Sequence, residues 1–529
     1  MNNQNESPFG SPRFLAALAI TFFGLWGWQY YISKNYSKPH ENQPTAQPVS
    51  ETKSEVAQTQ VNQSSTQLKD VDAPANQNVL SEVLTHYSDD NVSFDVSSKD
   101  MGIKNFTLKN YKDRAGEPIS FSTEFSQAGI KFQNQSVDFS INKMSDFEFV
   151  GTANFNGKNV KRILKYNKDL GFFNSTIEFE PGIESIQTAM YQKHFIPKNT
   201  NFLMPSFELQ DFIFIENGKT QDQNISSLKE NEGFLKTALA PSLVSVGTQY
   251  FSVAAVNKSE VIPTVTNKVE KNMASIEVNF DLKNSNVKSL SQIIYLGPKK
   301  SDVLLAIDPT LPEVMNYGMF GFISKILMKI MISLHGFLGN WGLAIIALTL
   351  IVRTILLPFN VISFRSAQAM QKIKPKMDAI RERYKDDPLR MNKETMALMK
   401  DQSANPLMGC LPMLIQIPIF FALWRAIGSS IEIYQQPFFG WIHDLSYHDP
   451  MFVFPILMGI TMYLQQKLTP TTMDPTQAKI LNFMPILFTL FMLTLPSGLT
   501  LYNFISSLFG VTQQFFLLRD NKAKDTQLA

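Results

Sequence analysis

Cysteine is almost absent from this chain of 529 residues, which contains only Cys410. A single cysteine excludes an intramolecular disulfide framework and any CxxC metal or redox motif. An excess of charge of one sign is also lacking, because 48 lysine and arginine residues face 46 aspartate and glutamate residues. Nucleic-acid-binding proteins depend on clustered cations that contact phosphates. We therefore expect no nucleic-acid partner.

Apolar residues are unevenly distributed along the chain. Residues 40–315 have the composition of a soluble domain, whereas residues 320–517 contain one long apolar run after another. Runs of about 20 apolar residues have the length of a helix that spans a bilayer. The sequence therefore predicts an α-helical polytopic membrane protein with about six transmembrane helices and a large soluble domain.

The N-terminal region predicts a membrane anchor and a linker. Residues 14–32 are apolar and end in tryptophans and tyrosines, which favour the headgroup region of a bilayer. The small residues of a signal-peptidase site are missing there. We interpret 14–32 as an uncleaved signal anchor that follows a cytoplasmic N-terminus at 1–13. Residues 38–77 are rich in Gln, Asn, Ser, Thr and Pro, which predicts a flexible linker.

Alternation of apolar and polar residues predicts an antiparallel β-sandwich in residues 78–315. Period-two alternation is typical of half-buried strands. It recurs at Val137, Phe139 and Ile141, then at Ile177 and Phe179, and again at Ile276, Val278, Phe280 and Leu282. The pairs Asn156-Gly157 and Asn217-Gly218 predict tight hairpin turns, because both central residues of a type I′ turn need positive φ.

The C-terminal part predicts a surface helix followed by a core of five spans at 341–517. In residues 320–338, Lys325 and Lys329 lie on a different helical face from the apolar residues, which predicts an amphipathic helix at the membrane interface. The five predicted spans lie at 341–359, 411–431, 451–466, 481–495 and 498–517.

Loop charges orient these spans. The connection at 360–410 contains ten lysine and arginine residues, whereas the loop at 432–450 contains none. Because positive residues stay inside, we expect 360–410 to be a cytoplasmic helical hairpin and 432–450 to be periplasmic. The same rule places the tail at 518–529 in the cytoplasm. An even number of spans then places the N-terminus in the cytoplasm too and makes the β domain periplasmic.

Arg353 lies inside the first predicted span of the core. An arginine at the centre of a spanning helix costs about 2.5–3.5 kcal/mol, and no Asp or Glu lies deep in any predicted span to neutralise it. We infer a hydrated polar cavity that opens to the cytoplasm. The alternative is a side chain that reaches the nearby cytoplasmic headgroups. Other polar residues available to such a cavity are Thr349, Gln416, Gln465, Thr489, Tyr502, Asn503 and Ser506.

Seven short segments occur in a characteristic order. They are IVR at 351–353, NPLMGC at 405–410, LIQIPIF at 414–420, WIHDL at 441–445, PTT at 470–472, FMP at 483–485 and PSGL at 496–499. This ordered set resembles the YidC family of bacterial membrane protein insertases, whose relatives work in mitochondria and chloroplasts. The resemblance is dense over residues 340–517 and weaker over the anchor, the linker and the β domain.

The resemblance implies an inner-membrane insertase and chaperone that is not an enzyme and needs no cofactor. Its last five spans would enclose a hydrophilic groove that is closed on the periplasmic side. Arg353 would attract acidic residues of a client, while Thr349, Gln416, Tyr502 and Ser506 would line the groove. Asn503 departs from the family pattern, which has an aromatic residue there. The implied partners are nascent membrane proteins, ribosome–nascent chain complexes, Sec translocon subunits and membrane lipids.

Methionines recur at helical spacing in the cytoplasmic hairpin. Methionine is flexible and adapts to varied partners, so this face predicts contacts with nascent chains. The alternative is a face that packs within the hairpin. The methionines concerned are Met370, Met377, Met391, Met396 and Met399.

Other classes of function find less support in the sequence. His443, Asp444, His448 and Asp449 match no metal-ligand spacing, so we expect no metal site. A secondary transporter or channel is the alternative function, although a transporter usually has internal repeats, and none is visible. An intramembrane protease would need a serine–histidine pair, and no histidine lies deep in a predicted span.

Overall fold

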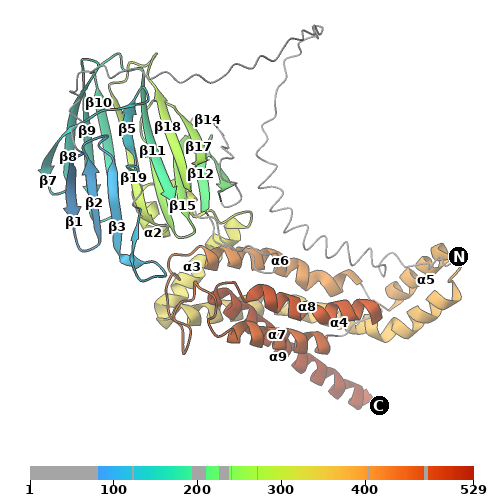
Figure 1. Cartoon of the computed structure of the whole chain (residues 1–529). Coiled ribbons are helices and arrows are strands. Elements are labelled where there is room, and N and C mark those ends of the chain that lie inside the picture. Colours follow the sequence, from blue (N-terminus) through green and yellow to red (C-terminus); the bar gives the residue numbers. More distant parts are fainter. Residues whose placement is uncertain are drawn as a thin grey trace, which may run out of the picture.

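The computed structural model describes residues 82–121, 124–193, 210–225, 237–239, 241–270, 272–402, 406–469 and 475–528. The predicted N-terminus, anchor and linker at 1–77 lie outside the described residues, as does the side chain of Cys410. Figure 1 shows a β domain at one end of a bundle of helices and a helical hairpin at the opposite end. The C-terminus also lies away from the β domain.

The β domain contains three antiparallel sheets. One has the order β1-β2-β3-β4, the second β13-β12-β15-β16-β19-β10-β9-β8-β7, and the third β14-β17-β18-β11-β5-β6. The strands are β1 (Leu84–Ser88), β2 (Val92–Ser97), β3 (Ile103–Lys112), β4 (Pro118–Ser120), β5 (Gly129–Phe132), β6 (Gln135–Ser136), β7 (Ser140–Ser145), β8 (Glu148–Phe155), β9 (Lys158–Asn167), β10 (Phe172–Phe179), β11 (Ser185–Lys193), β12 (Gln210–Glu216), β13 (Lys219–Asn224), β14 (Thr237–Leu239), β15 (Pro241–Thr248), β16 (Phe251–Asn257), β17 (Pro263–Glu270), β18 (Met273–Asp281) and β19 (Ser289–Pro298).

The alternation in the sequence reflects burial between these sheets. Ile276, Val278 and Phe280 of β18 are all buried, while the residues between them are partly exposed. Both predicted hairpin turns are confirmed. Asn156-Gly157 joins β8 to β9 and Asn217-Gly218 joins β12 to β13, with positive φ at all four residues.

Aromatic rings fill the core where the four-stranded sheet meets the nine-stranded one. Phe94 of β2 contacts Phe173 of β10 edge to face, with ring centroids 4.9 Å apart. Phe94 also contacts Phe149 of β8, at 5.9 Å. Edge-to-face pairs of this kind add to the free energy gained from burial alone. The small sheet is therefore part of the same core as the large one.

A fully buried arginine crosses this core. Arg162 of β9 has no exposed surface. Its Nη1 donates to the main-chain oxygens of Met101 (3.0 Å) and Ala128 (2.7 Å), and its Nε donates to Ser175 Oγ (3.1 Å). Burial lowers the pKa of Arg162 to about 10, so the side chain stays charged at neutral pH. Arg162 therefore ties three segments of the sandwich together.

The helical part follows directly from β19. Its elements are α2 (Ser301–Ile307), the 3-10 helix η1 (Leu311–Met315), α3 (Gly321–Leu338), α4 (Trp341–Arg383), α5 (Pro388–Asp401), α6 (Pro406–Gly428), α7 (Val453–Leu468), α8 (Pro475–Met492) and α9 (Ser497–Leu528). Among the described residues, α3 and α4 are long and apolar enough to cross a membrane, and shorter apolar stretches cover Leu414–Gly428 and Asn482–Met492. The number of six spans therefore stays a prediction.

α3 meets the length and composition of a spanning helix, although its sequence predicted an interfacial one. Figure 1 places α3 at the end of the bundle nearest the β domain, whereas α4, α6, α7, α8 and α9 run alongside one another. Lys325 of α3 forms a 3.1 Å ion pair with Glu313, next to the β domain. A lysine that is paired there favours the interfacial position, which remains a prediction.

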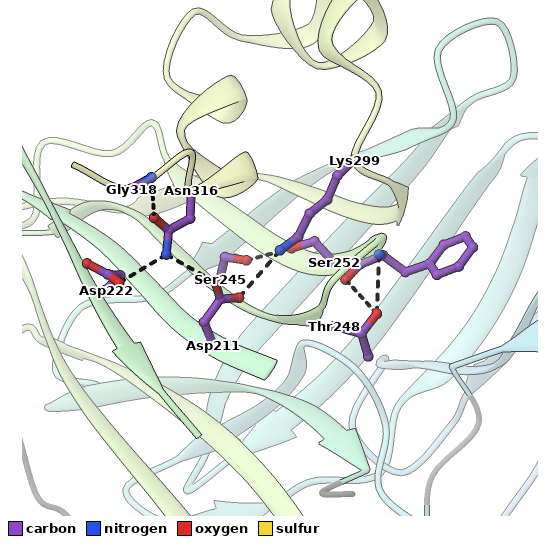
Figure 2. Close-up of polar contacts among 9 residues, drawn as sticks. Asp211, Asp222, Ser245, Thr248, Ser252, Lys299, Asn316 and Gly318 are labelled. Carbon is purple, nitrogen blue, oxygen red and sulfur yellow. Dashed lines mark hydrogen bonds and ion pairs between the residues drawn. The ribbon is translucent and has the colours of Figure 1, made fainter. Parts of the chain in front are cut away.

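A polar cluster with a buried ion pair fixes the direction in which the chain leaves the β domain (Figure 2). Lys299, which follows β19, is 3% exposed and lies 3.4 Å from Asp211 of β12. Asn316 has a positive φ, and its Nδ2 donates to Asp211 (3.3 Å) and to Asp222 of β13 (3.0 Å). Its Oδ1 accepts from the main chain of Gly318. Because paired charges are costly to separate when buried, this cluster holds the segment before α3 against the sheet.

Candidate functional site

Arg353 points into the helical bundle. Its Nε donates a 2.7 Å hydrogen bond to Ser506 Oγ of α9, and its Nη2 donates to the same oxygen. Ser506 is 3% exposed, so the guanidinium lies between α4 and α9. Within the part of the chain that the structure describes, no carboxylate pairs with Arg353. The group therefore retains donors for an incoming acceptor.

The Arg353–Ser506 pair continues into a second polar contact. Tyr502 of α9 is 2% exposed, and its hydroxyl accepts a 2.7 Å hydrogen bond from Gln416 Nε2 of α6. Ser506 also contacts the Tyr502 hydroxyl. We name these four residues, Arg353, Ser506, Tyr502 and Gln416, the polar network. It joins α4, α9 and α6 inside a bundle whose core is mostly apolar.

Two of the predicted groove residues lie apart from the polar network. Thr349 is fully buried, and its hydroxyl donates to the main-chain oxygen of Ile345 at 2.6 Å. Asn503 Nδ2 donates to Leu499 O at 3.0 Å, within its own helix. Both side chains thus donate their hydrogen bond to a main-chain carbonyl of their own helix, as hydroxyls and amides often do in apolar surroundings. The structure brings together four of the six predicted groove residues.

The end of the bundle nearest the β domain is closed by the loop between α6 and α7. The Ser497 and Gly498 amides at the start of α9 donate to Tyr447 O (2.6 Å) and Leu445 O (2.9 Å). Leu445 has no exposed surface. Gly342 at the start of α4 leaves room for the Phe438 ring, which would lie 2.0 Å from a Cβ at that position. We name this loop, residues 429–452, the closing loop. The packing of this loop was not predicted, although the tight turn at Pro496-Ser497-Gly498 was a signal for it.

Asp444 and Asp449, which were considered as metal ligands, have structural roles in the closing loop. Asp444 Oδ1 accepts from the main-chain amides of Gln435 (3.1 Å) and Ser446 (2.8 Å). Asp449 accepts from Trp441 Nε1 at 2.9 Å and from the Phe454 amide at 2.7 Å. Among the described residues, no group of three or more His, Cys, Asp or Glu side chains could hold a metal ion.

The methionines of the hairpin mostly pack inside it. α4 ends at Arg383, and α5 begins at Pro388 with Asp387 as its N-cap. Met377 and Met391 are buried, Met370 and Met399 pack beside Met377, and only Met396 is strongly exposed, at 67%. Apolar residues at helical spacing bury themselves against the partner helix when one is available. This packing favours the alternative interpretation for four of the five methionines.

The fold and the site define a class of protein. A bundle of apolar helices contains an arginine-centred polar network, is closed at one end, and carries an antiparallel β-sandwich at that end. This is a polytopic membrane protein with a large soluble domain.

Comparison with known proteins gives the family. A family model described as 60Kd inner membrane protein matches residues 333–525, and one described as YidC periplasmic domain matches residues 180–330. A Campylobacter jejuni protein named membrane protein insertase YidC is 32% identical over 546 residues, covering 98% of this chain and 97% of that protein. The chain belongs to the YidC family of membrane protein insertases.

Other relatives match in part. A Francisella tularensis subsp. novicida protein of the same name is 44% identical over 236 residues, which cover 45% of this chain and 43% of that protein. A crystal structure of an active YidC insertase with its first transmembrane domain resolved covers 82% of this chain and 91% of its own, at 18% identity and a TM-score of 0.37. The predicted fold class is confirmed as a helical membrane region with an antiparallel β-sandwich domain of the YidC periplasmic type.

Proposed function

We propose that this protein inserts and folds integral membrane proteins in the bacterial inner membrane. Supporting this are the family membership and the polar network, in which Arg353 offers hydrogen-bond donors inside an apolar bundle. The network would receive the polar end of a client while the client's apolar segment moves into lipid. Burial of apolar surface, at about 25 cal/mol per Å², would drive that movement without nucleotide hydrolysis.

The proposed topology places the two ends of the bundle on opposite sides of the membrane. The β domain and the closing loop would be periplasmic, and the α4–α5 hairpin and both termini cytoplasmic. The support is the positive charge of 360–410, the absence of lysine and arginine from 432–450, and the opposite positions of these segments in Figure 1. The domain boundaries proposed in the sequence analysis, from the cytoplasmic N-terminus at 1–13 to the cytoplasmic tail at 518–529, are part of this proposal.

Depletion of the protein in its host tests the function. Small membrane proteins are pulse-labelled and their insertion is followed by protease protection. Clients that stay uninserted on depletion and recover with the wild-type chain would support the proposal. Normal insertion without the protein would contradict it and would favour the transporter alternative, which an uptake assay measures.

The proposed partners of the hairpin are nascent chains and ribosome–nascent chain complexes, with Sec translocon subunits elsewhere on the protein. Leu389 and Met396 are the large apolar side chains most exposed on the hairpin, at 85% and 67%. Exposed apolar surface on one face of a helix can mark a docking site.

Deleting residues 370–400 is expected to impair insertion because it removes this surface. Replacing Leu389 and Met396 together with serine should give part of the same defect in the protease-protection assay. Met377→Leu is the matched control, since Met377 is buried within the hairpin. Unchanged insertion in the deletion variant would contradict a receiving role for the hairpin.

A further inference from the structure

The closing loop inserts into the β domain as well as into the helical bundle. Ile431 is 5% exposed and belongs to the hydrophobic core of the β domain, although it follows α6 in the sequence. Tyr434 packs against the same core. Burial of one isoleucine side chain contributes about 1.5–3 kcal/mol, so this contact stabilises the association of the closing loop with the β domain.

Two turns of the β domain form the receiving surface. In the turn between β15 and β16, Tyr250 lies 4.8 Å from Tyr434 between ring centroids, and Gln249 Nε2 donates to Gly428 O. Where β3 ends and its turn to β4 begins, the main-chain oxygen of Lys112 accepts from Tyr434 Oη at 2.7 Å and from Gln435 Nε2 at 3.0 Å. We name residues 430–435 the latch.

A titratable group lies inside the latch. Burial raises the pKa of Glu432 above its ordinary value of 4.5, against the opposing effect of a 2.6 Å hydrogen bond that the carboxylate accepts from Ser430 Oγ. Asp302 raises this pKa further, whereas Lys300 lowers it. Tyr111 and Tyr317 also face Glu432. Burial is the main cause that raises the pKa values of these two tyrosines, and the charge of Glu432 is the next. The charged groups that face the neighbouring Tyr434 are Asp113, Arg114 and Asp444.

The sign of the pH dependence follows from this environment. A carboxyl group with a raised pKa in the docked state binds its proton more tightly there than after release. Docking is therefore strongest below about pH 4.5, where the carboxyl is protonated in both states, and weakens as the pH rises through the raised pKa. Above that value no further change is expected.

We propose that the latch is a positioning element: Ile431 and Tyr434 hold the β domain and the closing loop together while Glu432 is protonated, and ionisation of Glu432 releases them. The closing loop also packs against the start of α9. Release of the latch would therefore loosen the closed end of the bundle, which a client's translocated tail must pass. This last step rests on the proposed function. The docking equilibrium itself does not.

Distance measurements between spin labels on the full-length protein test the latch. Labels are placed at Lys168→Cys, in the turn between β9 and β10, and at His443→Cys in the closing loop, in a Cys410→Ser background. Both labelled side chains are exposed. We expect one narrow distance distribution at pH 4.5 and a broad population that grows as the pH rises through the raised pKa of Glu432 and then stays constant. The docked-to-released ratio should fall by up to about tenfold per pH unit, the limit for one proton.

Variants separate the latch from general effects of pH. The distance distribution of Glu432→Gln should stay narrow at every pH, and that of Tyr434→Ala should be broad at every pH. Glu117→Gln, which removes an exposed carboxylate in the turn between β3 and β4, should behave as the wild type does. An identical pH response of wild type and Glu432→Gln, or a wild-type distribution that does not change with pH, would overturn the proposal.

An insertion assay on the same variants tests the link to translocation. Glu432→Gln should slow insertion of clients with long translocated tails more than clients with short ones. Equal effects on both would overturn that link. If the wild-type protein inserted no client, the proposed function would fail, while the distance measurements would still decide whether the latch exists.

Discussion

Replacing Arg353 with alanine is expected to reduce insertion of clients with acidic translocated tails by about tenfold or more. The guanidinium bonds only to Ser506 in the described structure, so its remaining donors are available to a carboxylate. A hydrogen bond to a charged group contributes about 1.5–3 kcal/mol, which corresponds to a factor of ten or more. Pulse-labelling and protease protection in depleted cells measure the change.

Two further variants separate charge from geometry at this position. Arg353→Lys keeps the charge but loses the planar donor pair, so acidic clients should recover in part. Ser506→Ala keeps the charge and removes the oxygen that orients it, so a smaller loss is expected. Clients with uncharged tails should depend little on any of these changes. Equal loss for acidic and uncharged tails in Arg353→Ala would contradict a role for the charge.

Replacing Arg162 with alanine is expected to destabilise the β domain by about 3–5 kcal/mol. The change leaves the main-chain oxygens of Met101 and Ala128 without their donor in a fully buried site. It also leaves a cavity at this fully buried position. Hydrogen exchange of β8, β9 and β10 in the full-length protein reports the loss of stability, since exchange through global opening of the domain becomes faster.

Lys165→Ala is the matched control, because Lys165 lies on the same strand with an exposed side chain. It should change exchange very little. Arg162→Met, which fills much of the space but supplies no donors, distinguishes lost packing from lost hydrogen bonds. Protection equal to that of the wild type in Arg162→Ala would show that water replaces the guanidinium without cost.

Features with a local cause could be predicted from the sequence. The turns at Asn156-Gly157 and Asn217-Gly218 follow from the conformational freedom of those residues, and the strand β18 follows from its alternation. The inward position of Arg353 could be anticipated too, because a charge in an apolar helix needs a polar neighbour. Its neighbour Ser506 was only one of several candidates in the sequence.

Features that depend on distant segments could not be predicted. Arg162 appears as one more charged residue in a strand, and nothing nearby indicates that Met101 and Ala128 are its partners. Ile431 is the last residue of the span predicted at 411–431 and Tyr434 comes three residues later, so their packing against the core of the β domain has no local signal. The same holds for Met377 and Met391, whose spacing describes an apolar face but not whether that face meets a client or the other half of the hairpin.

The length of α4 has a mechanical consequence. Its 43 residues run without interruption from the closed end of the bundle to the tip of the hairpin. Arg353 and Arg383 are thus about 45 Å apart on a single helix, at 1.5 Å per residue. A force on the hairpin reaches the guanidinium as tilting or bending of that helix, with no intervening loop to absorb it. Pro358 and Pro375 each lack a main-chain amide donor, so they are the points where the helix would bend.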